Sequence, residues 1–361
     1  MFKDMLPFLK KTLIVCSWVV IIFSLLFAKH LEKNPQQEAK TLTIFTWSSV
    51  FSNSFIKEFE KQTGIKVVLD YYSSNEELLM KLKKTGSNGY DLIIPSDYAV
   101  PMLKKEGLLQ EIDHSKLQFY QDIHPLLLAH AYDPENKYSI PLQWDICGFG
   151  INTDVFDDHQ DRRFTWSNLF DPTVINYKIA MTNDPVEAFA IGSHYLFGKK
   201  TDLSDQEILA VKNLLLQQKR HVEAYAVPRS DYILGSKNAS LALSLSAYIL
   251  RSQSYFPFMK FVVPEKSTAI SIENVCIPKA TTKNSAIYTF INFIYQKENL
   301  AQSCNDFGVF PATKSAEELL KYKKEYSEIM SKIQEPGYEL FFYQHLISEE
   351  KLRALWVQIK S

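Results

Sequence analysis

The chain has 361 residues, of which 46% are apolar and 22% are charged, and its formal net charge is -1 at pH 7. This length allows two domains or one large one, and the composition is that of a globular chain with a buried core, which excludes a fibrous or disordered protein. A near-neutral chain without a basic block is not typical of nucleic-acid binding, so no nucleic-acid partner is expected.

The first forty residues differ from the rest of the chain. Lys3, Lys10 and Lys11 precede an apolar run over 12–28, which a polar stretch follows. A positive flank, an apolar segment and a polar exit are typical of a secretory signal, which predicts a periplasmic protein. The run is long for a signal and barely long enough to cross a bilayer, so residues 1–40 are either a cleaved signal peptide or a retained anchor in the inner membrane. No other membrane contact is expected.

Strands and helices alternate directly after this segment. Apolar alternation predicts strands over 42–45 and 65–72. Each precedes a helix that begins at a serine–asparagine pair, either residue of which is a suitable N-cap, and that ends at a glycine, Gly64 or Gly86.

A third strand lies in the stretch 90–98. Pro95 ends it, because proline cannot donate a hydrogen bond to a neighbouring strand. Ser96 or Asp97 can cap the helix that begins near Tyr98, and Asp97 is the favoured cap. Three strand–helix pairs in succession predict a parallel, doubly wound half-sheet, and such sheets bind ligands at the carboxyl ends of their strands.

Two extended stretches, 138–152 and 270–278, predict crossings between this half and a second one. Between them we expect a strand over 178–181, a long amphipathic helix over 205–219 and a loop at 231–232. Two α/β lobes joined by two extended crossings are the architecture of a hinged protein that binds a ligand between its lobes.

Seven stretches identify the family more sharply. They are LTIFTW (42–47), TGIKVVLDYYSSNE (63–76), YDLIIPSDY (90–98), KKEGLLQEID (104–113), YSIPLQW (138–144), GFGINTDVF (148–156) and ENVCIP (273–278). In this order they make residues 41–361 resemble the spermidine/putrescine-binding proteins of ATP-driven polyamine uptake.

The resemblance implies a two-lobed periplasmic-binding-protein fold of type II with chain-discontinuous lobes. The N-terminal lobe is expected to be 41–148 plus 272–318, and the C-terminal lobe 149–271 plus 319–361. The implied protein is a monomer that is not an enzyme, needs no cofactor or metal, closes on a polyamine and delivers it to a cognate ABC permease.

The family's ligand positions can be carried over residue by residue. They fall on Trp47, Ser48, Ser96, Tyr98, Asp184, Glu187, Glu273 and Gln344. The resemblance implies that Trp47 and Tyr98 stack on the polyamine, because aromatic faces attract ammonium groups and cover methylenes. The three acids would accept hydrogen bonds from its charged nitrogens.

The chain also departs from the family pattern. The departures are Ser49 in place of an acid, Ser244 or a neighbour and Ser271 in place of two tryptophans, and Val309 or Phe310 in place of a tyrosine. Tyr232 and Tyr248 are candidates to compensate, and Tyr232 is included among the ligand-binding residues. The particular polyamine therefore stays open. A binder of another small cationic or organic solute, or a membrane-tethered ligand sensor, is the alternative.

The charged candidates have structural interpretations beside the functional ones. Asp184 before Pro185 is suited to cap a helix, and Glu187 in a first turn would complement the helix dipole. Trp47 at a strand end suits a core equally well, whereas a lone acid such as Glu273 in an apolar strand is costly to bury. Carboxylates that face one cleft repel each other, so we expect raised pKa values and an affinity that falls as these acids are protonated.

Cys147 and Cys276 lie in the two crossings. An oxidising compartment would allow a disulfide between them that staples the hinge, but buried free thiols are the favoured alternative.

An exported enzyme is the rival class, and no motif supports it. Ser96 lacks a Gly-x-Ser-x-Gly setting, no histidine pair has metal-ligand spacing, and Gly148-Phe149-Gly150 lacks the third glycine of a dinucleotide fingerprint.

Overall fold

The computed structural model describes residues 41–156, 163–226 and 229–361. Its strands are β1 (Thr41–Thr46), β2 (Lys66–Tyr71), β3 (Leu92–Ile93), β4 (Ile140–Asn152), β5 (Ile179–Met181), β6 (Val222–Tyr225), β7 (Leu241–Leu245), β8 (Met259–Val262), β9 (Ser267–Val275), β10 (Phe310–Pro311) and β11 (Glu339–Phe341). Its α-helices are α3 (Asn53–Thr63), α4 (Asn75–Thr85), α5 (Ala99–Lys105), α6 (Ser167–Phe170), α7 (Pro185–Phe197), α8 (Asp205–Gln218), α9 (Ser230–Gly235), α10 (Ser246–Ser252), α11 (Asn284–Ile294), α12 (Lys297–Phe307), α13 (Lys314–Glu317), α14 (Lys323–Ile333) and α15 (Glu349–Lys360). Short 3-10 turns lie at His114–Lys116, Tyr120–Asp122, Pro125–Leu127 and Lys219–His221.

The first lobe contains the predicted parallel sheet, with strand order β2-β1-β3. Its helices begin and end where the sequence predicts. The Ser52 hydroxyl caps α3 by accepting from the Phe55 N–H, and Ser74 caps α4 in the same way. Gly64 ends α3 at φ 71°, a backbone conformation that glycine adopts without the steric cost of a side chain.

The predicted cap of α5 is wrong. The helix begins at Ala99 without a side-chain cap. The Asp97 carboxylate instead accepts a hydrogen bond from the Ile272 N–H at 2.7 Å, so this side chain ties the first lobe to β9. Burial raises the pKa of Asp97 to about 7.

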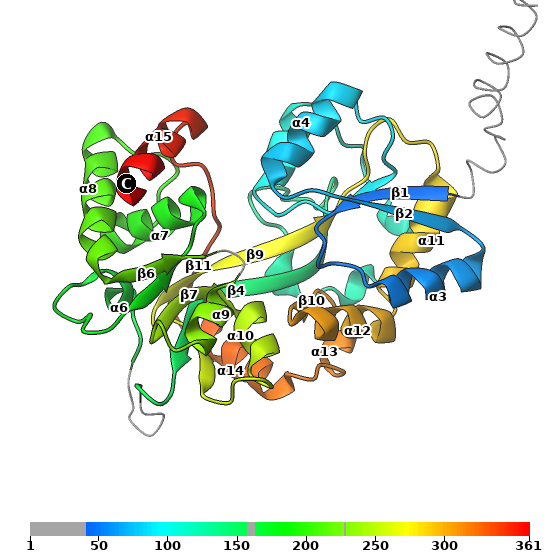
Figure 1. The fold of residues 1–361 in the computed structure, drawn as a ribbon. Coiled ribbons are helices and arrows are strands. Elements are labelled where there is room, and N and C mark those ends of the chain that lie inside the picture. Colours follow the sequence, from blue (N-terminus) through cyan, green and yellow to red (C-terminus); the bar gives the residue numbers. More distant parts are fainter. Residues whose placement is uncertain (1–40, 157–162, 227–228) are drawn as a thin grey trace, which may run out of the picture.

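The two predicted crossings are β4 and β9, which lie side by side in antiparallel register and run from one lobe to the other (Figure 1). Residues opposite each other include the pairs Gln143–Glu273 and Asp145–Ser271. Because side chains alternate along a strand, these residues share one face of the ribbon, and Trp144 points to the other, where its ring packs against Phe310.

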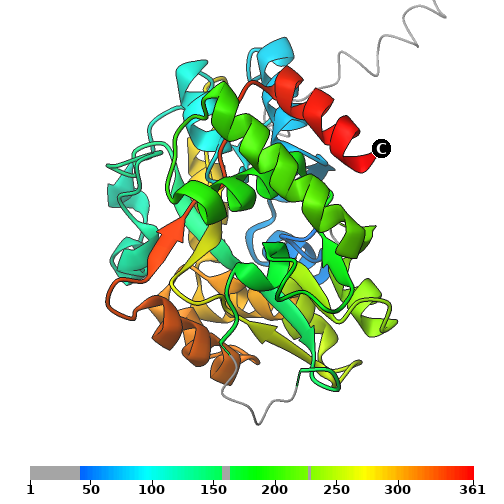
Figure 2. The ribbon, with the colours of Figure 1, turned by 90° about the vertical axis from the view of Figure 1, so that its left-hand side faces the viewer.

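The second lobe is built on the rest of a mixed sheet, whose strand order is β11-β9-β4-β7-β5-β6. Helices α7, α8 and α15 cover it on the outer side of the molecule (Figure 2). The expected loop at 231–232 is wrong, because these residues form helix α9. The glycines of Gly148-Phe149-Gly150 allow close packing: a Cβ at Gly148 would lie 2.6 Å from the Val262 carbonyl oxygen.

Buried thiols at Cys147, Cys276 and Cys304 are all free, so the hinge disulfide is not formed. Among the described residues, no helix is both long and apolar enough to cross a bilayer. The apolar run over 12–28 lies outside the described residues, and the choice between signal peptide and anchor stays a prediction. The bounds of the lobes likewise stay a prediction.

Candidate ligand-binding cleft

A cavity of about 270 Å³ lies between the lobes, above the β4–β9 ribbon. The residues that line it come from both lobes and from the ribbon: Trp47, Ser49, Val50, Ser73, Asn75, Ser96, Tyr98, Gln143, Trp144, Asp145, Asp184, Val186, Glu187, Leu245, Ala247, Tyr248, Arg251, Ser271, Glu273, Phe307, Val309 and Tyr343. Six of the nine residues predicted to bind ligand are among them.

Glu273 is the centre of the first wall. Its two carboxylate oxygens accept hydrogen bonds from Trp47 Nε1 and Ser96 Oγ, both at 2.8 Å. The three residues come from the ends of β1 and β3 and from β9. An antiparallel bridge between Ser96 and Glu273 holds the segment after β3 beside β9. Desolvation raises the pKa of Glu273 to about 8. The structure thus brings three predicted site residues into direct contact.

Asp184 and Glu187 form the facing wall at the start of α7. Asp184 Oδ1 accepts from the N–H groups of Val186 and Glu187 at 2.7 and 3.3 Å, so it is a helix cap and a cleft residue at once. Glu187 Oε2 accepts from Thr182 Oγ1 at 2.6 Å. This helix start therefore aims two acids at the cleft.

The expected rise in carboxylate pKa is confirmed, but its expected main cause is wrong. Burial raises the pKa of Glu187 to about 8, and the charge of Asp184 adds a smaller part. Burial also comes first in raising the pKa of Asp184. Desolvation by the surrounding lobe, more than repulsion between acids, favours the protonated forms in the absence of a cation.

Tyr98 stands where the two lobes meet. Its hydroxyl lies 3.5 Å from Glu76 Oε1, and its ring packs edge-on against His345 with centroids 6.1 Å apart. His345 Nε2 in turn lies 3.4 Å from Glu76 Oε1. Glu76 belongs to α4 and His345 to the C-terminal segment, so this contact joins the lobes. The sequence did not indicate it.

Three predicted residues do not line the cavity. Ser48 is exposed, and Tyr232 is 58% exposed with the Arg229 guanidinium over its ring at 5.1 Å. The Gln344 side chain turns away and donates to the Lys200 carbonyl. Of the two tyrosines proposed to compensate for missing aromatics, Tyr248 lines the cavity and Tyr232 does not.

Asp145 is an acid of the cleft that the sequence prediction missed. It accepts from the Ile146 N–H at 2.7 Å, from the Ala247 N–H at 3.3 Å and from the Ser246 hydroxyl. Burial raises the pKa of Asp145 to about 7. An acid within a nearly continuous apolar strand, two residues after Gln143, is the signal that could have found it.

A two-lobed α/β fold with a polar cleft over a two-stranded hinge defines a solute-binding protein. The family model for bacterial extracellular solute-binding proteins matches residues 54–329, and the chain belongs to this family.

Relatives agree with that assignment. The chain is 30% identical over 297 residues to the spermidine/putrescine-binding periplasmic protein of Escherichia coli K12, which covers 81% of this chain and 82% of the relative. It is 29% identical over 281 residues to the putrescine/cadaverine-binding protein of Pseudomonas aeruginosa PAO1, covering 75% and 78%. A spermidine/putrescine ABC transporter substrate-binding protein from Streptococcus pneumoniae superposes with a TM-score of 0.76 at 25% identity, over 89% of this chain and 98% of that one.

Proposed function

We propose that this protein captures a polyamine between its lobes outside the cytoplasm and delivers it to an ABC permease. The printed names of the relatives support this ligand class. The observation that carries the proposal is the cleft itself, in which Glu273 on the hinge and Asp184 and Glu187 on the second lobe face one cavity. None of these carboxylates forms an ion pair with a cation of the described residues, so a cation from the ligand can serve all three.

The residue types suit an alkyl chain with an ammonium group at each end. Trp47 and Tyr98 offer aromatic faces, each of which attracts an ammonium group by roughly 0.5–2 kcal/mol and covers methylenes. Carboxylates make charge-assisted hydrogen bonds to the ends. Since the pKa values of Glu187 and Glu273 are both raised to about 8, a bound dication favours their ionised forms and displaces protons from the cleft.

Closure of the lobes follows from where the acids lie. Glu273 sits on the ribbon beside the first lobe and Asp184 on the second, so a ligand contacts both acids only when the lobes are together. In this proposal the N-terminal lobe is 41–148 plus 272–318, and the C-terminal lobe is 149–271 plus 319–361. The protein acts as a periplasmic monomer without catalysis, and the segment 12–28 is its export signal or its membrane anchor.

One observation favours a second candidate ligand. Arg251, on α10, also lines the cleft and forms no ion pair with any carboxylate of the described residues. Arginine stays charged at any physiological pH and binds carboxylates in a bidentate manner. A small cation that also carries a carboxylate would satisfy it.

Calorimetric titration of residues 41–361 with putrescine, cadaverine, spermidine and spermine tests the proposal. We expect saturable heat with at least one of the four. Binding of an ω-amino carboxylate with none of these amines bound would favour the second candidate, and no heat from any of the compounds would reject both.

A further inference from the structure

The charges that line the cleft are distributed unevenly. The acids lie at the start of α7 and on the hinge ribbon, and they are Asp145, Asp184, Glu187 and Glu273. The one cation among the described residues that line the cleft is Arg251, which lies in the last turn of α10. One part of the cleft is therefore acidic, and the part beside α10 carries a positive charge.

Arg251 is half-buried and lies against an aromatic ring. Its guanidinium carbon is 5.8 Å from the centroid of the Tyr248 ring, which is within the range of a cation–π contact. Burial raises the pKa of Tyr248, the charges of Asp145 and Glu187 add to that rise, and the charge of Arg251 opposes it. Tyr248 is thus near the acids and the arginine at once, and the ring face that Arg251 covers is not available to a ligand ammonium.

The residues beside Arg251 in the cleft are uncharged. Ala247 precedes it by one turn of α10, so both lie on the helix face that lines the cleft. The end of α12 packs on this turn, because a Cβ on Gly308 would lie 2.7 Å from the Ala247 carbonyl oxygen. The residues on either side of that glycine, Phe307 and Val309, line the cleft as well. None of these neighbours supplies a carboxylate to balance the guanidinium.

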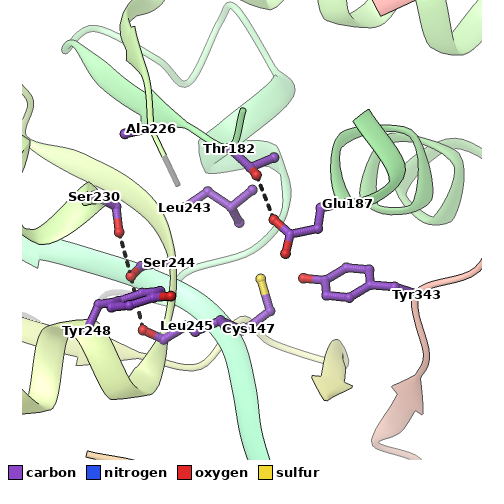
Figure 3. Close-up of a pocket in the computed structure, with 10 residues that line it drawn as sticks. All are labelled: Cys147, Thr182, Glu187, Ala226, Ser230, Leu243, Ser244, Leu245, Tyr248 and Tyr343. Carbon is purple, nitrogen blue, oxygen red and sulfur yellow. Dashed lines mark hydrogen bonds between the residues drawn. The ribbon is translucent and has the colours of Figure 1, made fainter. Parts of the chain in front are cut away.

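A ligand longer than a diamine has little room on the other side. There the cleft adjoins a cavity of about 20 Å³, which Glu187 and Tyr248 line from different elements (Figure 3). This volume holds one group the size of a water molecule, so an additional aminopropyl arm does not fit. The remaining direction within the cleft runs along α10, toward Arg251.

We propose that Arg251 limits the ligand to two positive charges, so that the protein selects diamines over triamines and tetramines. This inference rests on the proposed function and deepens it by specifying the charge of the ligand. Acids on opposite walls can balance the two ends of a diamine. A third ammonium would instead meet the guanidinium, and salt screens such a repulsion only weakly in a partly buried site.

Calorimetric titration of the protein with putrescine, cadaverine and spermidine tests this limit. We expect the better of the two diamines to bind at least about ten-fold more tightly than spermidine. Spermidine that binds as tightly as the better diamine, or more tightly, would overturn the inference and leave polyamine binding intact. If none of the three amines binds, the proposed function and this inference are both overturned.

A spermidine analogue with a hydroxyl in place of one terminal amine separates charge from length. It is as long as spermidine but carries only two positive charges. We expect it to bind clearly more tightly than spermidine, because a hydroxyl is not repelled by the guanidinium. An analogue that binds as weakly as spermidine would show that length alone excludes the triamine, which would overturn the role of Arg251.

Variants of Arg251 locate the effect. Arg251→Gln removes the charge and should improve the affinity for spermidine relative to the diamine by about ten-fold, whereas Arg251→Lys keeps the charge and should preserve the wild-type ratio. Arg220→Gln is the matched control, because it removes one positive charge from an exposed position outside the cleft. Its ratio should stay at the wild-type value.

The ratio compares two ligands on one protein, so a loss of stability in a variant does not affect it. An unchanged ratio in Arg251→Gln would overturn the inference. The same change in Arg220→Gln as in Arg251→Gln would also overturn it, since the net charge of the protein and not its cleft would then select the ligand.

Discussion

The two acidic walls of the cleft hold their carboxylates in different ways. Glu273 takes its hydrogen bonds from the side chains of Trp47 and Ser96, which line the cleft themselves. Asp184 takes its hydrogen bonds from backbone N–H groups at the start of α7. The hinge wall is thus a cluster of side chains that face the cleft, and the facing wall is a helix start that uses its Asp184 oxygen as a cap even without ligand. Substitutions at the two positions should separate binding from stability.

The largest effect is expected for Glu273→Gln. The amide can still accept from Trp47 Nε1 and donate to Ser96 Oγ, but it cannot balance an ammonium charge. Removing one member of a buried charge pair costs about 2–5 kcal/mol, so affinity for the bound polyamine should fall at least about 30-fold in a calorimetric titration. The thermal unfolding temperature of the unliganded variant should not fall, since the substitution removes a desolvated carboxylate. A destabilised variant with normal affinity would contradict this view of the wall.

Substitutions of Asp184 should affect stability more than Glu273→Gln does. Asp184→Asn keeps an oxygen for the Val186 N–H and loses only the charge, so affinity should fall about ten-fold with stability nearly unchanged. Asp184→Ala also removes the cap, which should lower the free energy of unfolding by about 1 kcal/mol more. Urea denaturation of the two variants measures that difference. Equal stabilities would mean that the cap contributes nothing, and the contrast between the walls would fail.

The sequence predicts the helices and the hinge strands better than it predicts which side chains meet in the cleft. Helix starts at Ser52 and Ser74, the hinge crossings and Asp184 as a cap all follow from local patterns, because capping and strand alternation depend on neighbouring residues. Asp97 shows the limit of such reasoning. Its local context suits a cap, yet a distant N–H on Ile272 takes the carboxylate, and only the tertiary fold places that donor.

Which side chains line the cleft also depends on strand register and on packing. Asp145 lines the cleft because β4 pairs with β9 so that Asp145 lies opposite Ser271. No local pattern gives that register. Tyr232 and Gln344 illustrate the converse, since residue type and resemblance favour them while the fold turns their side chains to other partners.

Changing pH should affect both walls together. The pKa of Glu187 and that of Glu273 are raised to about 8 from an ordinary 4.5. In this range the folded protein binds more protons than the unfolded chain, so stability of the unliganded protein should rise as pH falls from above 8 to about 4.5. Polyamine affinity should fall over the same range, because a cation requires the ionised acids. An affinity that stays flat from pH 7 to pH 4 would contradict the proposed site.

The share of Glu273 in both slopes can be measured. In Glu273→Gln, which cannot titrate, each slope should be shallower than in the wild-type protein, and thermal shift measured with and without ligand reports the two together. Unchanged slopes in this variant would place the titrating group elsewhere, at Glu187 or Asp145.

The smallest effect is expected at the contact between His345 and Glu76, which joins the lobes. Hydrogen bonding to Glu76 raises the pKa of His345 above its ordinary 6.5, and the carboxylates of Glu349 and Asp184 act in the same direction. The contact is therefore fully formed below pH 6.5 and is lost as pH rises through the raised value. Because it links the lobes, it favours the closed form, and a partly exposed pair of this kind contributes up to about 1 kcal/mol.

His345→Gln should accordingly weaken polyamine affinity by no more than about five-fold at pH 6 and leave it unchanged at pH 8.5. Glu76→Gln should give the same pH-dependent loss. In the double variant the two losses should not add, because either change alone removes the whole contact. Additive losses would mean that each residue acts on the ligand separately, and closure would then depend on the hinge and the ligand without this contact between the lobes.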